Sequence, residues 1–301
     1  MLPINGLHHV TSLASDPQVN SDFFTKALGL RRVKKTVNFD APDVYHLYYG
    51  DAAGTPGSVM TYFPFPHIAK GRHGTGEVGE TVFAIPQGSL GFWKDRLGGE
   101  EAVSFGETRL RFTGPDGDQF ALVETDDARE GWTGTVSADH SVRGFRGASL
   151  RLRDGGATGE LLRFMGYDQE ASEGNLTRWR VPNGNGADII DIETLPGTET
   201  ARQGGGSVHH IAFSTPDRAS QDEVRRALLD TGWQVTPPID RDYFWAIYFR
   251  TPGGVLFEVA TAEPGFDRDE SFAHLGEGLK LPSQHEPLRA RLEQHLQPIE
   301  D

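Results

Sequence analysis

Two histidine pairs, far apart in the chain, are the residues best suited to chemistry. "GLHHVTSL" begins at Gly6 and "SVHHIAFS" begins at Ser207. Side chains alternate along a strand, so His9 and His210 would occupy corresponding positions, each with its preceding histidine on the opposite face. One histidine in a strand is more often a hydrogen-bonded core residue. Two copies at matching positions favour metal binding.

A single carboxylate supplies the third candidate ligand. Glu258 lies in "VLFEVA", an otherwise apolar strand. A buried carboxylate needs a partner, because desolvating an unpaired charge costs several kcal/mol. Arg241 or Arg250 could serve as a plain ion-pair partner, and a metal ion is the alternative. Two imidazoles and one carboxylate leave coordination positions open and suit non-heme Fe(II).

The first copy of the repeat lacks this carboxylate. Aligning "TPGSVMTY" with "TPGGVLFE" places Tyr62 opposite Glu258. We therefore expect no fourth protein ligand, which leaves room for substrate and dioxygen.

A tyrosine and an arginine lie near these ligands in the sequence. Tyr248 precedes, and Glu258 follows, the turn at residues 251–254. If that turn closes a hairpin, both side chains share a face and lie almost opposite each other. The Tyr248 hydroxyl could then donate a proton, although an ordinary core tyrosine fits the spacing as well. Arg241 could stabilise an oxyanion or be a solvated surface residue.

The ligands must be positioned by a repeated set of elements. "GTPGSVMTYF" matches "RTPGGVLFEV", and looser copies are "TGPDGDQFALVET" and "VPNGNGADIIDIET"; in each a Pro- and Gly-containing turn leads into an apolar strand. Upstream of each turn lie a short strand and a helix, expected at residues 19–28, 89–97, 158–165 and 221–231. Ser220 and Glu223 form a capping box for the fourth. The sequence thus predicts an α+β fold of four βαβββ modules.

The modules group into two halves followed by a tail. We expect an N-terminal domain at residues 1–135, a C-terminal domain at 136–264, and a tail at 265–301. Ser283 and Glu286 resemble a capping box, and Leu288, Leu292 and Leu296 form an apolar stripe. The tail should therefore contain a helix that packs on the body.

Composition excludes several classes of protein. The 301 residues carry a formal net charge of −14, which argues against nucleic-acid or anionic-membrane partners. The absence of cysteine excludes disulfides and zinc–thiolate sites. No signal-peptide pattern and no long apolar run are evident, so we expect a soluble cytoplasmic protein.

The histidine pairs and the turns resemble those of the vicinal oxygen chelate superfamily (glyoxalase, bleomycin resistance and extradiol dioxygenase). Within it, the chain is similar to hydroquinone ring-cleaving dioxygenases. The stretches that carry the resemblance are "LHHVTSLASDPQVNSDFFTKALGLRRVKKTVNFD", "VYHLYYGDAAGTPGSVMTYFPFP", "VHHIAFSTPD", "RDYFWAIYFRTPGGVLFEVAT" and "GFDRDESFAHLGEGLKLP".

The resemblance implies both a fold and a chemistry. Paired modules would form two cup-like mixed sheets with helices outside, the first and fourth modules sharing one cup. His9, His210 and Glu258 would bind Fe(II), with Mn²⁺ or Zn²⁺ as alternatives. A small aromatic para-diol and O2 would react there, the ring opening beside a hydroxyl-bearing carbon. Supporting roles carry over to five residues: Thr11, Arg241, Tyr248, His8 and His209.

Two other functions stay open. A glyoxalase-type isomerase or lyase would use a metal as a Lewis acid, but such enzymes commonly have a second carboxylate where this chain has Tyr62. A metal-free module that binds an apolar ligand is the other possibility. The ring substituents, the native metal, the roles of His8 and His209, and a possible homo-oligomer are not determined by the sequence. His46, in "VYHLYYG", suggests a pocket wall.

Overall fold

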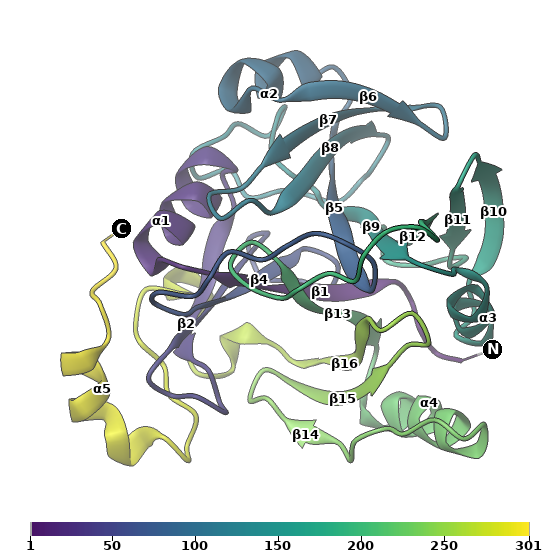
Figure 1. Cartoon of the computed structure of the whole chain (residues 1–301). Coiled ribbons are helices and arrows are strands. Elements are labelled where there is room, and N and C mark those ends of the chain that lie inside the picture. The colour runs from purple at the N-terminus through teal and green to yellow at the C-terminus, as the bar shows by residue number, and fades with distance from the viewer. Residues whose placement is uncertain (1, 301) are drawn as a thin grey trace.

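The computed structural model describes residues 2–300, and residues 7–264 form four successive strand–helix–strand–strand–strand modules (Figure 1). Module 1 contains β1 (Leu7–Ala14), α1 (Pro17–Asp22), a π-helical turn (Phe23–Ala27), β2 (Arg31–Val37), β3 (Tyr45–Gly50) and β4 (Val59–Pro64). Module 2 contains β5 (Glu77–Pro86), α2 (Leu90–Leu97), β6 (Glu100–Ser104), β7 (Glu107–Thr113) and β8 (Gln119–Thr125). The predicted α+β repeat is thus confirmed in the first half.

The second half repeats the same order. Module 3 contains β9 (Gly144–Leu152), α3 (Gly156–Phe164), β10 (Asp168–Glu173), β11 (Leu176–Arg180) and β12 (Ile189–Thr194). Module 4 contains β13 (Val208–Thr215), α4 (Arg218–Asp230), β14 (Ile239–Asp240), β15 (Phe244–Arg250) and β16 (Leu256–Pro264).

The modules pair across the two halves of the chain. Modules 1 and 4 form one eight-stranded sheet in the order β14-β15-β16-β13-β1-β4-β3-β2, and modules 2 and 3 form the other in the order β10-β11-β12-β9-β5-β8-β7-β6. The first strands of the paired modules, β1 with β13 and β5 with β9, join antiparallel at the centre of each sheet. Both sheets are mixed and curled, as expected, and the first and last modules share one of them. The division at residue 135 stays a prediction.

The helices lie outside the sheets (Figure 1). α4 buries Val224 and Leu228, and its Gln221 side chain donates to the backbone oxygens of Trp245 and Val259. Its N-cap is Asp217, which accepts from the Ser220 N–H, so the predicted Ser220–Glu223 capping box is wrong. Aspartate is as strong a cap as serine, and here it starts the helix earlier.

The tail packs on module 1 as an extended segment with short helical turns. They are Phe266–Arg268, Phe272–His274, Glu286–Leu288 and finally α5 (Arg289–His295). Leu292 is fully buried, which confirms that the predicted helix packs on the body. In the described part of the chain no side chain caps α5 or the turn before it, so the predicted Ser283–Glu286 capping box is also wrong. Within residues 2–300, no helix is long and apolar enough to cross a membrane.

Candidate metal centre

The centre of the first sheet has approximate two-fold symmetry. Val10 pairs with Ile211, and this pair is flanked by His9 opposite Ala212 and by Thr11 opposite His210. Exchanging β1 and β13 therefore exchanges His9 with His210. The equivalence inferred from the repeated sequence holds in three dimensions.

Each of the other two histidines is the extra residue of a β-bulge. Between Leu7 and His9 the register shifts so that His8 has no partner on β13, and between Thr11 and Ser12 it shifts so that His209 has none on β1. A bulge re-aims a side chain and breaks the alternation of faces. Regular strands would point these histidines away from the centre, but both strands are bulged at these positions.

The bulges bring the two members of each pair into contact. Nδ1 of His8 lies 2.9 Å from Nδ1 of His9, and Nδ1 of His209 lies 2.8 Å from Nδ1 of His210. The other ring nitrogen of His8 lies 3.1 Å from the backbone oxygen of Thr261. His9 and His210 are thus held at Nδ1, which leaves their Nε2 atoms to point into the cup.

These Nε2 atoms meet the carboxylate of Glu258. They lie 3.3 Å apart, and Oε2 of Glu258 lies 3.4 Å from that of His9 and 2.9 Å from that of His210. One ligand atom from each residue falls within 4.8 Å of the others, and all three residues are buried. Two imidazoles and a carboxylate converging in this way could hold one metal ion.

Glu258 itself provides the test of whether a cation fits. Its side chain is completely buried, and neither of its oxygens receives a well-formed hydrogen bond from any of residues 2–300. Within residues 2–300, Glu258 forms no ion pair with Arg241 or Arg250, the two partners considered from the sequence. Arg241 pairs instead with Asp40 at 3.3 Å, and the Arg250 guanidinium donates to the backbone oxygen of Gly254. A buried, unsatisfied carboxylate beside two imidazole nitrogens suits a divalent cation.

The surroundings favour an ionised carboxylate at Glu258 and neutral rings at His8, His209 and His210. Burial alone would raise the pKa of Glu258, but His9 and His210 hold it well below its usual range. Burial lowers the pKa of His210, although Glu258 acts in the opposite direction. Burial, with the neighbouring ring, lowers the pKa of His8 to about 3 and that of His209 to about 4. Neutral imidazole and ionised carboxylate are the forms that bind metals.

The structure corrects one sequence alignment by a single residue. Thr61 on β4 pairs with Thr11 on β1, and Glu258 on β16 pairs with Ala212 on β13. Because the two-fold symmetry exchanges Thr11 with Ala212, Thr61 is the counterpart of Glu258. Tyr62 lies on the opposite face, where its hydroxyl donates to Asp118 at 2.8 Å. The counterpart of Glu258 in the first module is therefore a threonine and not the tyrosine that the sequence alignment places there.

Tyr248 lies where the predicted hairpin would put it. It pairs directly with Glu258 across β15 and β16. The Nε of Arg241 donates to its hydroxyl at 3.3 Å, and its ring lies edge-on to His210 with centroids 5.8 Å apart. Burial, together with the Glu258 carboxylate, raises the pKa of Tyr248 well above its usual value. The hydroxyl therefore stays protonated and can donate a proton or a hydrogen bond.

A cavity of about 360 Å³ opens over the three converging groups. Its polar lining includes Arg241, Tyr248, His209 and His46. Its apolar lining is Leu13, Phe39, Phe63, Phe65, Phe244 and Leu256. A larger cavity of about 670 Å³ shares only His209 and Leu256 with it and contains none of the three converging groups. The smaller cavity has the size and lining of a site for a small aromatic molecule.

Comparison with known proteins decides the family. The family model of the Glyoxalase/Bleomycin resistance protein/Dioxygenase superfamily matches residues 85–259. One relative is a Bacillus subtilis protein, MhqO, which is named as a ring-cleaving dioxygenase. It is 41% identical to this chain, over 98% of this chain and 96% of its own length. The chain belongs to this superfamily.

Two further relatives narrow the comparison. The chlorohydroquinone/hydroquinone 1,2-dioxygenase of Sphingobium indicum is 34% identical over 96% of this chain and 95% of its own. The crystal structure of a Bacillus subtilis protein named as a dioxygenase matches with a TM-score of 0.96 and 40% identity, covering 100% of this chain and 99% of that one. Glyoxalase I from Zea mays, at 14% identity, covers 86% of this chain and 92% of its own, with a TM-score of 0.63, and shares the fold alone.

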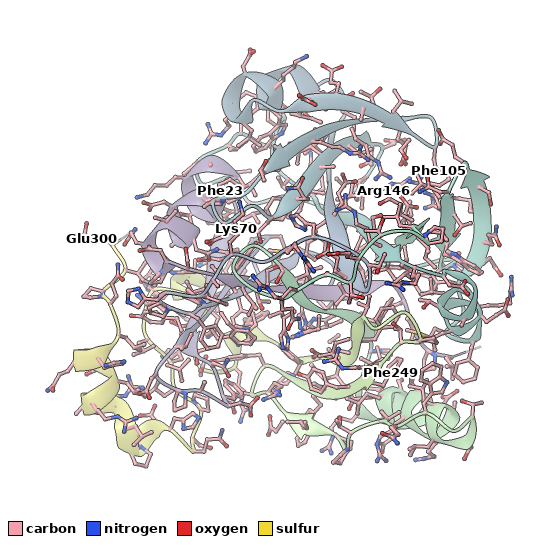
Figure 2. The ribbon with its side chains drawn as sticks, viewed as in Figure 1. Phe23, Lys70, Phe105, Arg146, Phe249 and Glu300 are labelled. Carbon is pink, nitrogen blue, oxygen red and sulfur yellow. The ribbon has the colours of Figure 1, made fainter. Side chains whose placement is uncertain are left out.

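Members of the superfamily are typically metal-dependent, yet among residues 2–300 the second sheet contributes no comparable set of ligands. The registers place Glu80 where His9 stands, Gly147 where His210 stands and Asp191 where Glu258 stands. The Arg109 guanidinium donates to Glu80 and to Asp191, each at 2.8 Å. The counterpart of His209 is Arg146, labelled in Figure 2, which pairs with Glu107. A guanidinium thus neutralises these carboxylates, whereas in the first sheet His9, His210 and Glu258 form a group that could hold a metal ion.

Of the predicted site residues, His8 does not line the cavity, and neither does Thr11. The Thr11 hydroxyl lies 2.8 Å from that of Thr61, which in turn lies 2.9 Å from Nε2 of His46. Nδ1 of His46 lies 2.8 Å from the Tyr48 hydroxyl. The sequence did not indicate Tyr48 or Phe244 as site residues. The centroid of the Phe244 ring lies 4.9 Å from that of the His9 ring. The motif "VYHLYYG" gave a signal for the strand of Tyr48, but its pairing with β4 is visible only in the fold.

Proposed function

We propose that the chain is a metal-dependent ring-cleaving dioxygenase that opens a para-hydroquinone with O2. The observation that carries this proposal is the buried, unsatisfied Glu258 carboxylate, which meets two imidazoles at the floor of an aromatic cavity. The names of the relatives support the same reaction class.

His9, His210 and Glu258 would hold Fe(II), with Mn²⁺ or Zn²⁺ as alternatives. Bound there, iron would supply open coordination positions and the redox chemistry that couples an electron-rich ring to dioxygen. The reaction is of the extradiol type. A ring C–C bond beside a hydroxyl-bearing carbon breaks, both atoms of O2 enter the product, and no other reductant is consumed.

The chain's own residues would position and charge-stabilise the substrate. Phe39, Phe63 and Phe244 form apolar walls that hold the ring and exclude water. The Arg241 guanidinium stabilises the negative charge of an ionised ring oxygen. The Tyr248 hydroxyl, held by Arg241 and kept protonated, supplies a proton during cleavage.

Oxygen consumption tests this function. The protein is loaded anaerobically with Fe(II) and then exposed to air with a hydroquinone, and oxygen uptake with ring-opened product is expected. Uptake that is absent with every hydroquinone and catechol would overturn the proposal. Zinc-dependent isomerase activity without oxygen uptake would point to the glyoxalase-type alternative. Retained ligand binding in a chain that takes up no metal would point to a metal-free binding module. Cytoplasmic location and homo-oligomer formation stay predictions.

A further inference from the structure

Tyr48 occupies in module 1 the position that Tyr248 occupies in module 4. Tyr48 pairs with Thr61 and Tyr248 pairs with Glu258, and these two partners are two-fold counterparts. Directly paired residues of neighbouring strands share a face of the sheet. Direct pairing across neighbouring strands joins one set of residues, Tyr48, Thr61, Thr11 and His210. The two-fold symmetry relates it to a second set, Tyr248, Glu258, Ala212 and His9. Tyr48 is therefore on the concave face that carries the metal ligands.

The Tyr48 hydroxyl is fixed by a chain of hydrogen bonds. It lies 2.8 Å from Nδ1 of His46, whose Nε2 lies 2.9 Å from the Thr61 hydroxyl, which is bonded in turn to Thr11. The Tyr48 and His46 rings pack with centroids 4.0 Å apart. Both residues are buried and both line the 360 Å³ cavity. The chain holds the hydroxyl at the wall of the cavity.

The same chain leaves the Tyr48 oxygen with unused hydrogen-bonding capacity. Burial lowers the pKa of His46 well below its usual value, so its ring is neutral and donates through one nitrogen while accepting through the other. If Nδ1 donates, the Tyr48 proton is free; if Nδ1 accepts, a lone pair of the Tyr48 oxygen is free. In both cases the complementary ligand group is a hydroxyl, because a hydroxyl can donate and accept.

The position of Tyr48 fits the far end of a ring bound at the metal centre. Tyr48 lies on β3, two strands from the β1 strand of His9, and neighbouring strands are about 4.8 Å apart, so the two backbones are roughly 10 Å apart. Tyr248, by contrast, is on the strand next to Glu258 and is already bonded to Arg241. In a para-diol the second oxygen is at the opposite end of the ring from the first, whereas in a catechol the two are adjacent.

We propose that the Tyr48 hydroxyl, positioned by His46, binds the remote hydroxyl of a para-diol and so sets a preference for 1,4-diols over 1,2-diols. This inference rests on the proposed function, since it concerns the same cavity. Asn38 and Asp40 also line the cavity, but Oδ1 of Asn38 already accepts from the N–H groups of Asp40 and Ala41, and Oδ2 of Asp40 accepts from Arg241.

The test compares ligands that differ in one hydroxyl. Metal-loaded protein is titrated anaerobically with hydroquinone and with 4-methylphenol, in which a methyl group replaces the remote hydroxyl. Tyr48→Phe should weaken hydroquinone binding about tenfold, the value of one hydrogen bond, and leave 4-methylphenol binding unchanged. Tyr49→Phe is the matched control, because that hydroxyl bonds Asn20 on the opposite face of the same strand.

A second variant and an activity ratio complete the test. His46→Asn should lower the same binding ratio, and Tyr48→Phe should lower the kcat/KM for hydroquinone relative to catechol. The inference is overturned if Tyr48→Phe weakens both ligands equally or neither, or if Asn38→Ala abolishes the discrimination and Tyr48→Phe does not. Failure of the proposed function looks different: the wild-type protein would consume no oxygen, while the binding comparison would still report on Tyr48.

Discussion

Asp191 occupies in the second sheet the register position that Glu258 occupies in the first, but Asp191 is neutralised by arginine. Its Oδ2 accepts from Arg109 at 2.8 Å, and its Oδ1 accepts from Nε of Arg178 at 2.8 Å. The same fold thus carries a guanidinium-bridged carboxylate in one cup and an unsatisfied carboxylate in the other. This difference indicates that Glu258 is placed to bind a cation that comes from outside the chain.

The arginine bridge should be essential for stability. Arg109→Ala leaves Glu80 and Asp191 short of a buried partner, and we expect the free energy of unfolding to fall by roughly 3–5 kcal/mol. Arg111→Ala is the matched control, because it removes a partner of the same Glu80 from a side chain that is 48% exposed. That loss should be under about 1 kcal/mol. Equal losses in denaturant unfolding would contradict this account of the second sheet.

The bulge histidines should tune metal affinity without being ligands. His8→Ala removes the group that orients His9 through Nδ1, and such partners typically change metal affinity about 10–100-fold. His209→Ala should act in the same way on His210. Calorimetric titration with a divalent metal measures both effects, with the exposed His274→Ala as control. Unchanged affinity in both bulge variants would show that the paired histidines have no role at the centre.

Tyr248 should act on turnover more than on binding. Tyr248→Phe keeps the ring beside His210 but removes the proton donor, so kcat should fall about 10²–10⁴-fold with little change in substrate affinity. Steady-state oxygen uptake gives kcat, and anaerobic titration gives the affinity. A variant with wild-type kcat would exclude the hydroxyl as the proton donor.

Asp118, which accepts a hydrogen bond from Tyr62 of the first sheet, should make the stability of the protein depend on pH. Burial raises its pKa from 3.8 to about 6, although the Tyr62 hydroxyl donates to it. The folded protein then holds this proton more tightly than the unfolded chain, so stability falls as pH rises from about 4 to about 6. Relative to wild type, Asp118→Asn should gain roughly 3 kcal/mol across that window, as measured by urea unfolding at each pH. A constant difference between the two proteins would contradict the raised pKa.

The sequence predicted those features that depend on local repeats. The paired histidines, the carboxylate in "VLFEVA" and the hairpin that sets Tyr248 opposite Glu258 all follow from strand alternation and turn chemistry. What it could not predict depends on pairing between distant strands. The bulges at His8 and His209 exist only in the β1–β13 register, and they turn both histidines toward their neighbours.

A register error of one residue had the largest local consequence. Shifting a strand by one position moves every side chain to the other face. The turn motifs align Tyr62 with Glu258, whereas the pairing of β4 with β1 puts Thr61 there and sends Tyr62 toward Asp118. The Thr11–Thr61–His46 chain of hydrogen bonds and the Arg109 bridge also join residues that are distant in the sequence. No local sequence pattern could therefore predict them.

Metal binding by the wild-type chain and by Glu258→Gln tests the central claim most directly. The amide keeps the shape of the side chain but removes the charge that a cation needs. Anaerobic calorimetry with Fe(II), paired with elemental analysis of the dialysed protein, should give one ion per wild-type chain and a loss of binding in the variant. Thermal stability of the wild type should rise with metal concentration, and that of Glu258→Gln should not. Equal binding by both chains, or binding by neither, would contradict the claim that His9, His210 and Glu258 hold one metal ion.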